Sequence, residues 1–459
     1  MLPVLVRFIR IDNQYFEGDS ALTMPSATGS LWSATCASLE PLPQLRVDAR
    51  AEVAVIGAGY TGLSAALHVA AAGREVVTLD AAQVGEGASG LNGGQVIAGL
   101  KHDPDVLADR YGAQIGAQLT ARSAEAPDLV FDLIRRHSIE CDAVRTGWMQ
   151  LAASESHLPL LQRRVDQWRR RGADVAVLSD REAAQLTGST RYCGGWIDRR
   201  GGTVQPLAYV RGLARAAMRS GARIFTRSAA EKLSRSGGEW RIDTPRASVV
   251  ARTVILATDA YTDRAFDALR RTVVAVPSIQ VATGPLSPDL RASILPGGQS
   301  VSDTKRLLCY FRLDAAGRLV LGTRGSFGDI PIPMTTAAHE RALREIYPAL
   351  AGLPLEYRWG GLVALTRDGL PHLHELAPGL LAGLGYNGRG VAMATVIGRL
   401  LARRALGESA ESLEFPVTSL QPIRLHGLSR LAARATIRYL QVRDALEQGA
   451  RWPQRRSAA

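Results

Sequence analysis

The pattern of apolar and polar residues predicts a strand, a helix and a second strand in the first fifth of the chain. Apolar residues dominate 52–56, an alanine-rich helical stretch follows at about 62–72, and a second apolar run spans 75–80. Gly73 ends the helical pattern. This order is typical of a βαβ unit, whose two strands are parallel.

The rest of the chain carries both periodicities. Helical patterns occur at roughly 104–137, 155–171 and 206–220, and strand-like runs at 148–152, 195–198, 224–226 and 253–257. A long strand pattern covers 273–283, and the turn at 314–317 joins 307–313 to 318–323 as a hairpin, which predicts a second, antiparallel sheet. A strand at 380–384, a glycine-rich turn and a helix to about 406 then repeat the strand-glycine-helix order.

Length and composition narrow the class of protein. With 459 residues, the chain exceeds the size at which one hydrophobic core keeps growing, so we expect two closely joined domains. The net charge is +12, but no helix-turn-helix, zinc or aromatic RNA-binding motif accompanies it, so we expect no nucleic-acid partner. The longest apolar runs fall short of the roughly 18 residues of a membrane span, and we expect a cytoplasmic protein without an integral membrane segment.

The four cysteines are far apart, with no CxxC pair, which predicts reduced structural thiols and no metal site.

The glycines between the first two predicted strands indicate a dinucleotide site. Gly57 permits a tight turn, Gly59 lets the backbone approach a pyrophosphate, and Gly62 allows close packing of helix and strand. Asp80 lies at the end of the second strand, where an acid accepts hydrogen bonds from a ribose. The alternative is a glycine turn with a purely structural role, and the fingerprint itself does not separate FAD from NAD.

A second glycine-rich segment at 85–95 follows this unit. It is too long for a simple turn and suits backbone that lies against a large planar cofactor, although a flexible surface loop has the same composition.

Eight motifs in a shared order carry a resemblance to a known family. They are LWSAT at 31–35, GAGYTG at 57–62, GASGLNGGQ at 87–95, GGTVQP at 201–206, VILATDAY at 254–261, WGG at 359–361, TRDGLP at 366–371 and GYNGRGV at 385–391. On these motifs the chain resembles the D-amino-acid-oxidase-like FAD-dependent oxidoreductases, especially their γ-glutamylputrescine oxidase branch, over most of 28–447.

The resemblance implies an α/β fold with a Rossmann-type FAD-binding domain interleaved with an α+β substrate domain built on an antiparallel sheet. We assign 28–140, 195–265 and 355–410 to the FAD-binding domain, 141–194 and 266–354 to the substrate domain, 1–27 to a loose tail, and 411–459 to a C-terminal helical segment and tail. The basic, amphipathic stretch 424–446 then packs on the FAD domain or docks at a membrane or quinone.

The resemblance also implies the cofactor-binding residues, with the flavin facing 89–95 and the turn at 385–391 near its pyrimidine edge. The complete set is Gly57, Gly59, Tyr60, Thr61, Gly62, Asp80, Ala88, Ser89, Asn92, Gly93, Gly94, Gln95, Ala230, Ala257, Thr258, Tyr261, Gly385, Asn387, Gly388, Arg389, Gly390 and Val391.

Three residues depart from the pattern of the family. Asp80 replaces the usual Glu, Leu91 stands where Arg is common, and Arg389 stands where His is common. The last two flank the expected flavin face, so they bear on the substrate. Because no cysteine follows Cys309, the C-terminal attachment of some relatives is missing here, and we expect dissociable FAD.

The expected chemistry needs little from the protein beyond positioning. The flavin takes a hydride at N5 from carbon next to an amine nitrogen, and the imine product hydrolyses. Tyr310 and Arg312, at alternate strand positions, are candidates to face a cavity, with Arg312 pairing a substrate carboxylate; structural packing is the alternative. Trp359 and Arg389 complete the set of candidate catalytic residues, whereas the histidines lack partner spacing.

Four functions remain open on this basis. The first is an amine or amino-acid oxidase that uses O₂ and forms H₂O₂, and the second is a dehydrogenase that passes electrons to a quinone or an electron-transfer flavoprotein. An NAD-dependent dehydrogenase and a non-catalytic flavoprotein are the other two.

Overall fold

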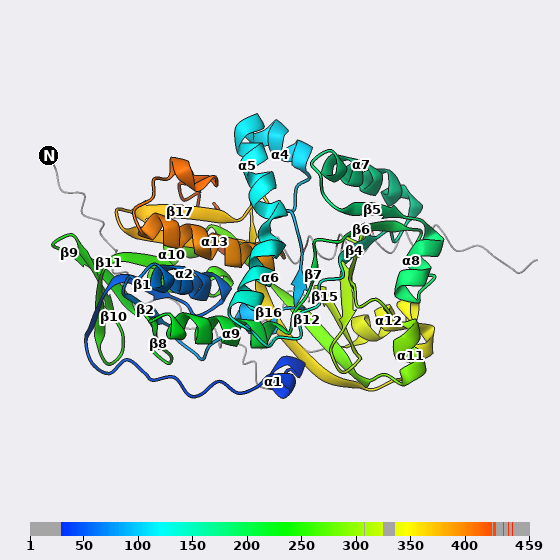
Figure 1. Cartoon of the computed structure of the whole chain (residues 1–459), viewed down its shortest axis with the longest axis horizontal. Helices are drawn as coiled ribbons and strands as arrows, with labels where there is room; N and C mark the ends of the chain where they lie inside the picture. The colour runs from blue at the N-terminus through cyan, green and yellow to red at the C-terminus, as the bar shows by residue number, and fades with distance from the viewer. Residues whose placement is uncertain are drawn as a thin grey trace, which may run out of the picture.

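The computed structural model describes residues 29–306, 308–324 and 336–424, together with residues 426, 427, 435, 439 and 443. The predicted tail over 1–27 and most of the predicted helix over 424–446 lie outside the described residues. Two large sheets lie side by side in the described part, with the helices packed around them (Figure 1).

The first sheet has a parallel centre, as the βαβ pattern predicts. Its strands run in the order β19 (Val417–Thr418), β17 (His372–Ala377), β18 (Leu380–Leu384), β11 (Ser248–Leu256), β1 (Ala49–Ile56), β2 (Val76–Leu79) and β8 (Arg223–Phe225). All pairs from β18 to β8 are parallel. The hairpin of β9 (Lys232–Ser236) and β10 (Glu239–Asp243) joins β11 in an antiparallel manner. The strand β19 differs from the helical segment predicted after residue 411.

The helices α2 (Tyr60–Ala71), α9 (Pro206–Arg219) and α13 (Gly390–Ala405) cover one face of this sheet, and α6 (Ala126–Arg136) packs against α13. The helices α13 and α9 both pack against α2 (Figure 1). A Cβ atom on Gly398 of α13 would lie 2.3 Å from the backbone oxygen of Thr61, so glycine sets how closely α13 approaches α2. The Tyr386 hydroxyl, just before α13, lies 2.5 Å from the Thr61 hydroxyl in the first turn of α2, so both helices begin at the same end of the sheet.

The second sheet is mainly antiparallel and confirms the predicted fold class. Its order is β16 (Leu355–Thr366), β12 (Val273–Pro285), β15 (Arg318–Arg324), β14 (Cys309–Leu313), β13 (Ser300–Asp303), β4 (Trp148–Leu151), β6 (Gly195–Asp198) and β5 (Val175–Leu178). Only the pair of β13 and β4 is parallel among these strands of the described chain. The predicted hairpin is confirmed as β14 and β15, with Gly317 at a φ of 77° in its turn.

Two strands of the second sheet, β6 and β16, lie within the segments 195–265 and 355–410, which the sequence analysis assigns to the FAD-binding domain. The strand β6 pairs with β4 and β5, and β16 pairs with β12 along almost its whole length. A strand pattern does not specify its partner strand, because the partner comes from a distant segment. By sheet membership, both strands belong with the second sheet.

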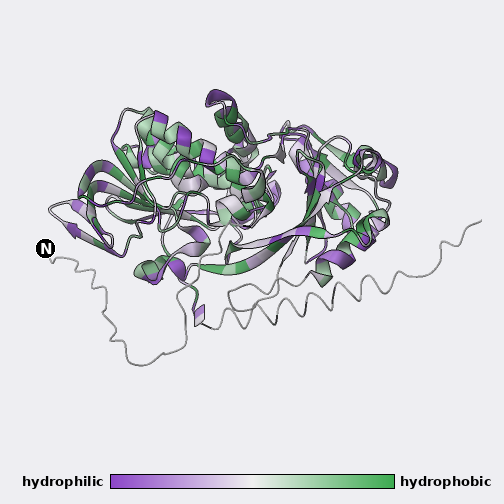
Figure 2. Cartoon of the chain, turned by 90° about the horizontal axis from the view of Figure 1, so that it is seen from below, coloured by the Kyte–Doolittle hydropathy of each residue, from purple (hydrophilic) through white to green (hydrophobic). Residues whose placement is uncertain are grey.

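The remaining described elements complete the architecture. They are α1 (Leu31–Thr35), α3 (Ala88–Leu91), α4 (Pro104–Tyr111), α5 (Ala113–Ala124), α7 (Leu158–Arg169), α8 (Asp180–Thr187), α10 (Asp267–Arg270), α11 (Pro288–Ser293), α12 (Ala337–Ile346), β3 (Gln95–Val96) and β7 (Gly202–Thr203). The helical pattern predicted over 104–137 is thus three helices, because Gly112, at a φ of 82°, and Glu125 interrupt it. Many helices carry apolar and polar residues side by side (Figure 2), as expected of helices with one buried face.

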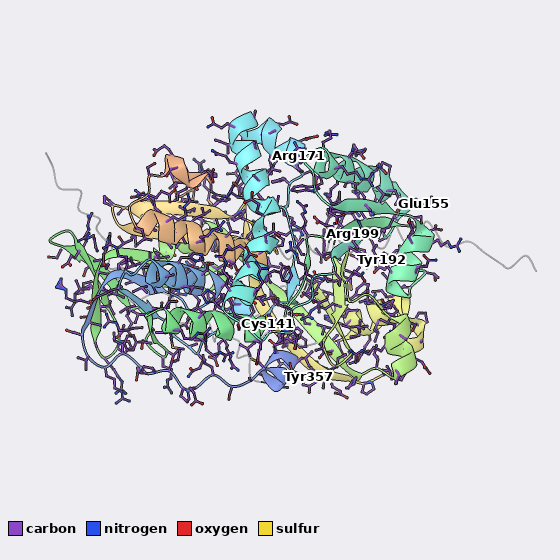
Figure 3. All side chains as sticks on the ribbon, in the orientation of Figure 1. Cys141, Glu155, Arg171, Tyr192, Arg199 and Tyr357 are labelled. Carbon is purple, nitrogen blue, oxygen red and sulfur yellow. The ribbon has the colours of Figure 1, made fainter. Side chains whose placement is uncertain are left out.

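The cores of the two parts are built from different side chains. One core cluster lies between α2, α9 and α13 and the first sheet, and another surrounds β14 and β15 in the second. Tyr192, labelled in Figure 3, belongs to the latter cluster. The four cysteines are free thiols, and Cys141 and Cys309 are buried.

Candidate active site

A cavity of about 1550 Å³ extends from the carboxyl end of the parallel strands to the face of the second sheet. It is larger than the roughly 300–1,000 Å³ of a pocket for one drug-sized ligand. Its lining includes the turn after β1, the loop after β2, the turn before α13 and parts of β4, β12, β13 and β14. This is the position at which open α/β sheets bind their ligands.

The turn after β1 is built as the glycine spacing predicts. Gly57 adopts a φ of 111°, and a Cβ atom there would lie 2.7 Å from the backbone oxygen of Ala257. Gly59 is the N-cap of α2 and provides no side-chain cap, so the first N–H groups of the helix need partners from outside it. Gly62 does not line the cavity, but a Cβ there would lie 1.8 Å from the Gly57 oxygen, which agrees with a packing role.

Asp80 closes this turn from the second strand. Its two carboxylate oxygens accept hydrogen bonds from the backbone N–H groups of Ala58 at 2.6 Å and Ala82 at 2.8 Å. Burial raises the pKa of the carboxyl, and these two bonds act in the opposite direction. Each oxygen of a carboxylate accepts about two hydrogen bonds, so Asp80 keeps acceptor capacity toward the cavity that it lines.

The glycine-rich loop after β2 contains the one-turn helix α3 and lies against the beginning of α2. The Ser89 hydroxyl oxygen accepts a hydrogen bond from the Tyr60 N–H at 3.0 Å. The Asn92 side chain stays within the loop, donating to the Ser89 oxygen at 2.8 Å and accepting from the Gly94 N–H at 2.8 Å. The loop is therefore held in one shape by its own side chains.

Gly93 and Gly94 are required for different reasons. A Cβ on Gly93 would lie 2.7 Å from the ring of Tyr310, whereas a Cβ on Gly94 would lie 2.1 Å from the oxygen of Val204. Gly93 lines the cavity and Gly94 lies outside its lining.

The turn before α13 forms the opposite wall. Asn387, at a φ of 52°, accepts a hydrogen bond from the Thr366 N–H at 3.0 Å and donates to the Gly385 oxygen at 2.6 Å. The helix begins at Gly390 without a side-chain cap, and a Cβ on Gly388 would meet no atom within 4 Å. The turn thus presents an uncapped helix N-terminus and open space to the cavity.

Asp259 is a residue of this site that the sequence reasoning missed. Its carboxylate accepts a hydrogen bond from the Gly385 N–H at 2.7 Å, and burial raises its pKa to about 6. It thereby ties the end of β11 to the turn before α13. An aspartate three residues after a predicted buried strand is the sequence signal that could have identified it, since aspartate tolerates the positive φ of 44° found there.

The remaining predicted cofactor residues lie around the same cavity. Its lining includes Ala88, Gln95, Ala230, Ala257, Thr258, Tyr261, Arg389 and Val391. Gly385 supports the turn without lining the cavity. The Tyr261 hydroxyl accepts a hydrogen bond from the Leu362 N–H at 3.0 Å, which joins this residue to β16.

The candidate catalytic residues separate into two groups. Tyr310 and Arg389 line the cavity, but Arg312 and Trp359 do not. Arg312 donates to the backbone oxygens of Gly93 at 2.7 Å and Val204 at 2.8 Å. These bonds hold the glycine-rich loop from behind, so the side chain is not directed at a substrate carboxylate.

Trp359 holds the same loop. Its ring N–H donates to the Leu91 oxygen at 3.2 Å, and its ring packs edge-on against Trp32 at 5.4 Å. The Arg312 guanidinium lies 4.9 Å from the Trp32 ring on the same side of the loop. Sequence spacing alone does not separate this supporting position from the cavity wall.

Polar residues of the second sheet form the far wall. The Tyr310 hydroxyl lies 3.0 Å from the Ser278 hydroxyl. The Trp148 ring N–H donates to the Ser302 hydroxyl at 3.1 Å, and this hydroxyl donates to Gln95 at 3.2 Å. The carboxyl of Asp303, whose pKa burial raises to about 6, also lines the cavity.

The cavity fits FAD on three observations of this structure. Two uncapped helix N-termini meet in it, where pyrophosphate oxygens and the electron-rich edge of a flavin bind favourably. Asp80 retains acceptor sites for ribose hydroxyls, and the volume exceeds that of a mononucleotide-sized pocket. The fold and the site together define a two-sheet, dinucleotide-binding redox enzyme.

Comparison with known proteins gives the family. Residues 52–404 match the family described as DAO, FAD dependent oxidoreductase, and the chain belongs to this family. FAD is therefore its cofactor. The resemblance that the eight motifs predict is confirmed.

Individual relatives cover most of the chain. The protein is 33% identical over 374 residues to the probable oxidoreductase OrdL of Haemophilus influenzae, which covers 80% of this chain and 85% of that one. It is 32% identical over 388 residues to the gamma-glutamylputrescine oxidoreductase of Escherichia coli, covering 84% and 91%. The structure of glycine oxidase from Geobacillus kaustophilus shares the fold, with a TM-score of 0.67 at 23% identity, covering 81% and 99%.

Among the residues that the structure describes, no helix has the length and apolar character needed to cross a bilayer.

Proposed function

We propose that this protein oxidises the C–N bond of an amine of the γ-glutamylputrescine type and passes the electrons to O₂. The observation that carries the proposal is one continuous cavity, lined both by the glycine-rich turns and by the polar wall of the second sheet. The similarity to the gamma-glutamylputrescine oxidoreductase of Escherichia coli supports the substrate class.

FAD, water and O₂ account for all the atoms and electrons of the proposed reaction. Bound FAD supplies the redox chemistry, since flavin N5 accepts a hydride from the carbon next to the amine nitrogen. The resulting imine takes up water and gives a carbonyl compound and a released amine or ammonia. The two electrons and two protons removed from the substrate reduce O₂ to H₂O₂.

The residues of the chain position the amine and keep its nitrogen neutral. Burial raises the pKa of Tyr310, so its phenol keeps its proton at neutral pH and acts as a hydrogen-bonding group. Tyr310 and Ser278 together present two hydroxyls to the cavity, beside apolar Leu308. Enclosure in the cavity withdraws a bound amine from water, which disfavours its charged form, and the neutral nitrogen is the form whose neighbouring carbon loses a hydride.

The loop residues keep this geometry without touching the substrate. Arg312 and Trp359 hold the backbone of the glycine-rich loop through the oxygens of Gly93 and Leu91. We assign them to positioning the loop that faces Tyr310.

Anaerobic reduction of the FAD tests the proposal. The purified yellow protein is mixed without oxygen with polyamines, γ-glutamyl amines, N-methyl amino acids and D-amino acids, and absorbance near 450 nm is followed. We expect bleaching with a γ-glutamyl amine, followed in air by one H₂O₂ for each amine oxidised. Flavin that stays oxidised with the whole panel would refute amine oxidation. Bleaching by an amine without formation of H₂O₂ in air would mean that the electron acceptor is a quinone or an electron-transfer flavoprotein and not O₂.

A further inference from the structure

Arg389 connects the two sheets across the cavity. Its backbone is the N-cap of α13 in the FAD-binding part, but its guanidinium carbon lies 4.8 Å from the centre of the Trp148 ring on β4. Both residues line the cavity. The side chain therefore extends away from the turn that precedes α13 and toward the wall formed by the second sheet.

The positive charge of Arg389 has no partner in the described ranges. No carboxylate there lies within ion-pair distance of it, and its Nη1 atom is buried without a hydrogen bond. Burial and the nearby Arg164 lower its pKa to about 10, which still leaves it protonated at neutral pH. Arg389 is partly buried, and a cation that is partly withdrawn from water without a counter-charge is costly, so an anionic ligand would complete the arrangement.

The two acids that attract Arg389 electrostatically, Asp198 and Asp103, are already paired elsewhere. Asp103 accepts two hydrogen bonds from Arg164, at 2.5 and 3.2 Å. Asp198 accepts two from the Arg200 side chain, at 2.9 and 2.6 Å. Neither carboxylate is available to neutralise Arg389.

The ring of Trp148 fixes the orientation of the Arg389 guanidinium. The ring is buried and fixed, since its N–H donates to the Ser302 hydroxyl and its edge packs on Trp196 at 5.5 Å. A guanidinium that stacks on an indole has its plane set by the ring, while its N–H groups remain directed sideways.

We infer that Arg389 is a specificity residue that binds a carboxylate of the substrate. This inference rests on the proposed function and narrows its substrate class to amines that also carry a carboxylate, such as a γ-glutamyl diamine. A guanidinium pairs with a carboxylate through two parallel hydrogen bonds, and the ligand supplies the missing counter-charge. A diamine without a carboxylate meets the like charge of Arg389 instead and binds poorly.

A matched set of amines tests the inference. Flavin reduction is measured with γ-glutamylputrescine, with its α-carboxamide, which lacks only the negative charge, and with putrescine. We expect the carboxylate to lower KM by roughly 10- to 100-fold relative to the carboxamide, the range of a charge-assisted, bidentate pair. R389M should have about the same KM for the carboxylate and the carboxamide, and its kcat should change much less than its KM.

Arg270 provides the control. It lines the same cavity but is already paired with Asp267, through hydrogen bonds of 3.1 and 2.5 Å. R270M removes one cavity cation and should keep the wild-type preference for the carboxylate. Equal loss of the preference in R270M and R389M would overturn the inference in favour of a general electrostatic effect.

Binding of glutarate, which has no amine to oxidise, separates this inference from the proposed function. Glutarate is titrated into the FAD-loaded protein, and binding is followed by calorimetry and by the flavin spectrum. The Kd of R389M should be at least tenfold higher than that of the wild type. If no amine bleaches the flavin, the proposed function fails while this comparison still decides the inference. If R389M loses FAD, R389K replaces it, with weaker binding of about 3- to 10-fold expected from loss of the forked donor. Unchanged glutarate binding in whichever variant retains FAD would overturn the inference.

Discussion

Replacing Asp259 by asparagine should change how the stability of the apoprotein depends on pH. Asp259 has a φ of 44° and accepts a hydrogen bond from the Gly385 N–H at 2.7 Å. Asparagine tolerates this backbone conformation and keeps an oxygen to accept the same bond, but it has no charge to bury. The substitution therefore isolates the cost of ionising the carboxyl in place.

The magnitude follows from the pKa of Asp259, which burial raises from an ordinary value of 3.8 to about 6. A raised carboxyl pKa means that the folded state binds more protons than the unfolded state between these values. The stability that protonation contributes is complete below about pH 4 and is lost as the pH rises through 6. At about 1.4 kcal/mol per pH unit, the loss approaches about 3 kcal/mol at pH 8.

Urea unfolding of the wild-type and D259N apoproteins between pH 4.5 and 8 measures the effect. The free energy of unfolding of D259N should exceed that of the wild type by an amount that grows with pH. Asp48→Asn is the control, because hydrogen bonds from the Ser248 N–H and hydroxyl hold the pKa of Asp48 below its ordinary value, and no histidine contributes to this shift. Its difference from the wild type should stay flat over this range. A flat difference for D259N, or a less stable D259N at pH 8, would refute the reasoning.

Four further predictions concern the cavity and its supports. Tyr310→Phe should slow flavin reduction by about 3- to 10-fold at unchanged FAD content, measured by stopped flow, whereas Tyr192→Phe, a buried tyrosine whose hydroxyl has no hydrogen bond, should match the wild type. Asp80→Asn leaves one acceptor for two backbone N–H groups and should weaken FAD binding by about 10- to 100-fold in a fluorescence titration; D80E should lose less than tenfold. Gly398→Ala forces a Cβ to 2.3 Å from the Thr61 oxygen and should cost about 1–3 kcal/mol in urea unfolding. Removal of FAD present at 100 times its Kd takes away about 2.7 kcal/mol, which for a chain of this length should lower the Tm by roughly 3 °C, seen by calorimetry.

The dinucleotide half of the site could be predicted because its signals are local. The turn at Gly57 depends on a positive φ, the start of α2 on the glycine N-cap at Gly59, and the position of Asp80 on the length of one βαβ unit. Each property is encoded within about 25 residues of chain. The same is true of the turn at 385–391, where Asn387 supports its own loop.

The part of the site that faces the second sheet could not be predicted, because it depends on contacts between segments that are far apart in the sequence. Tyr310 and Arg312 lie on the same side of β14, as their alternation predicts, yet the glycine-rich loop covers Arg312 and leaves Tyr310 in the cavity. Asp259 acquires its role only because the turn at Gly385 packs against β11.

The sequence by itself determined the βαβ unit, the two classes of sheet and the residues that form the glycine-rich turns, because backbone conformation and side-chain periodicity are local properties. Only the tertiary structure decided which sheet β6 and β16 join, and that Arg389 crosses from α13 to Trp148. These outcomes depend on long-range strand pairing and on which charges are already paired, and neither is encoded in the spacing of residues along the chain.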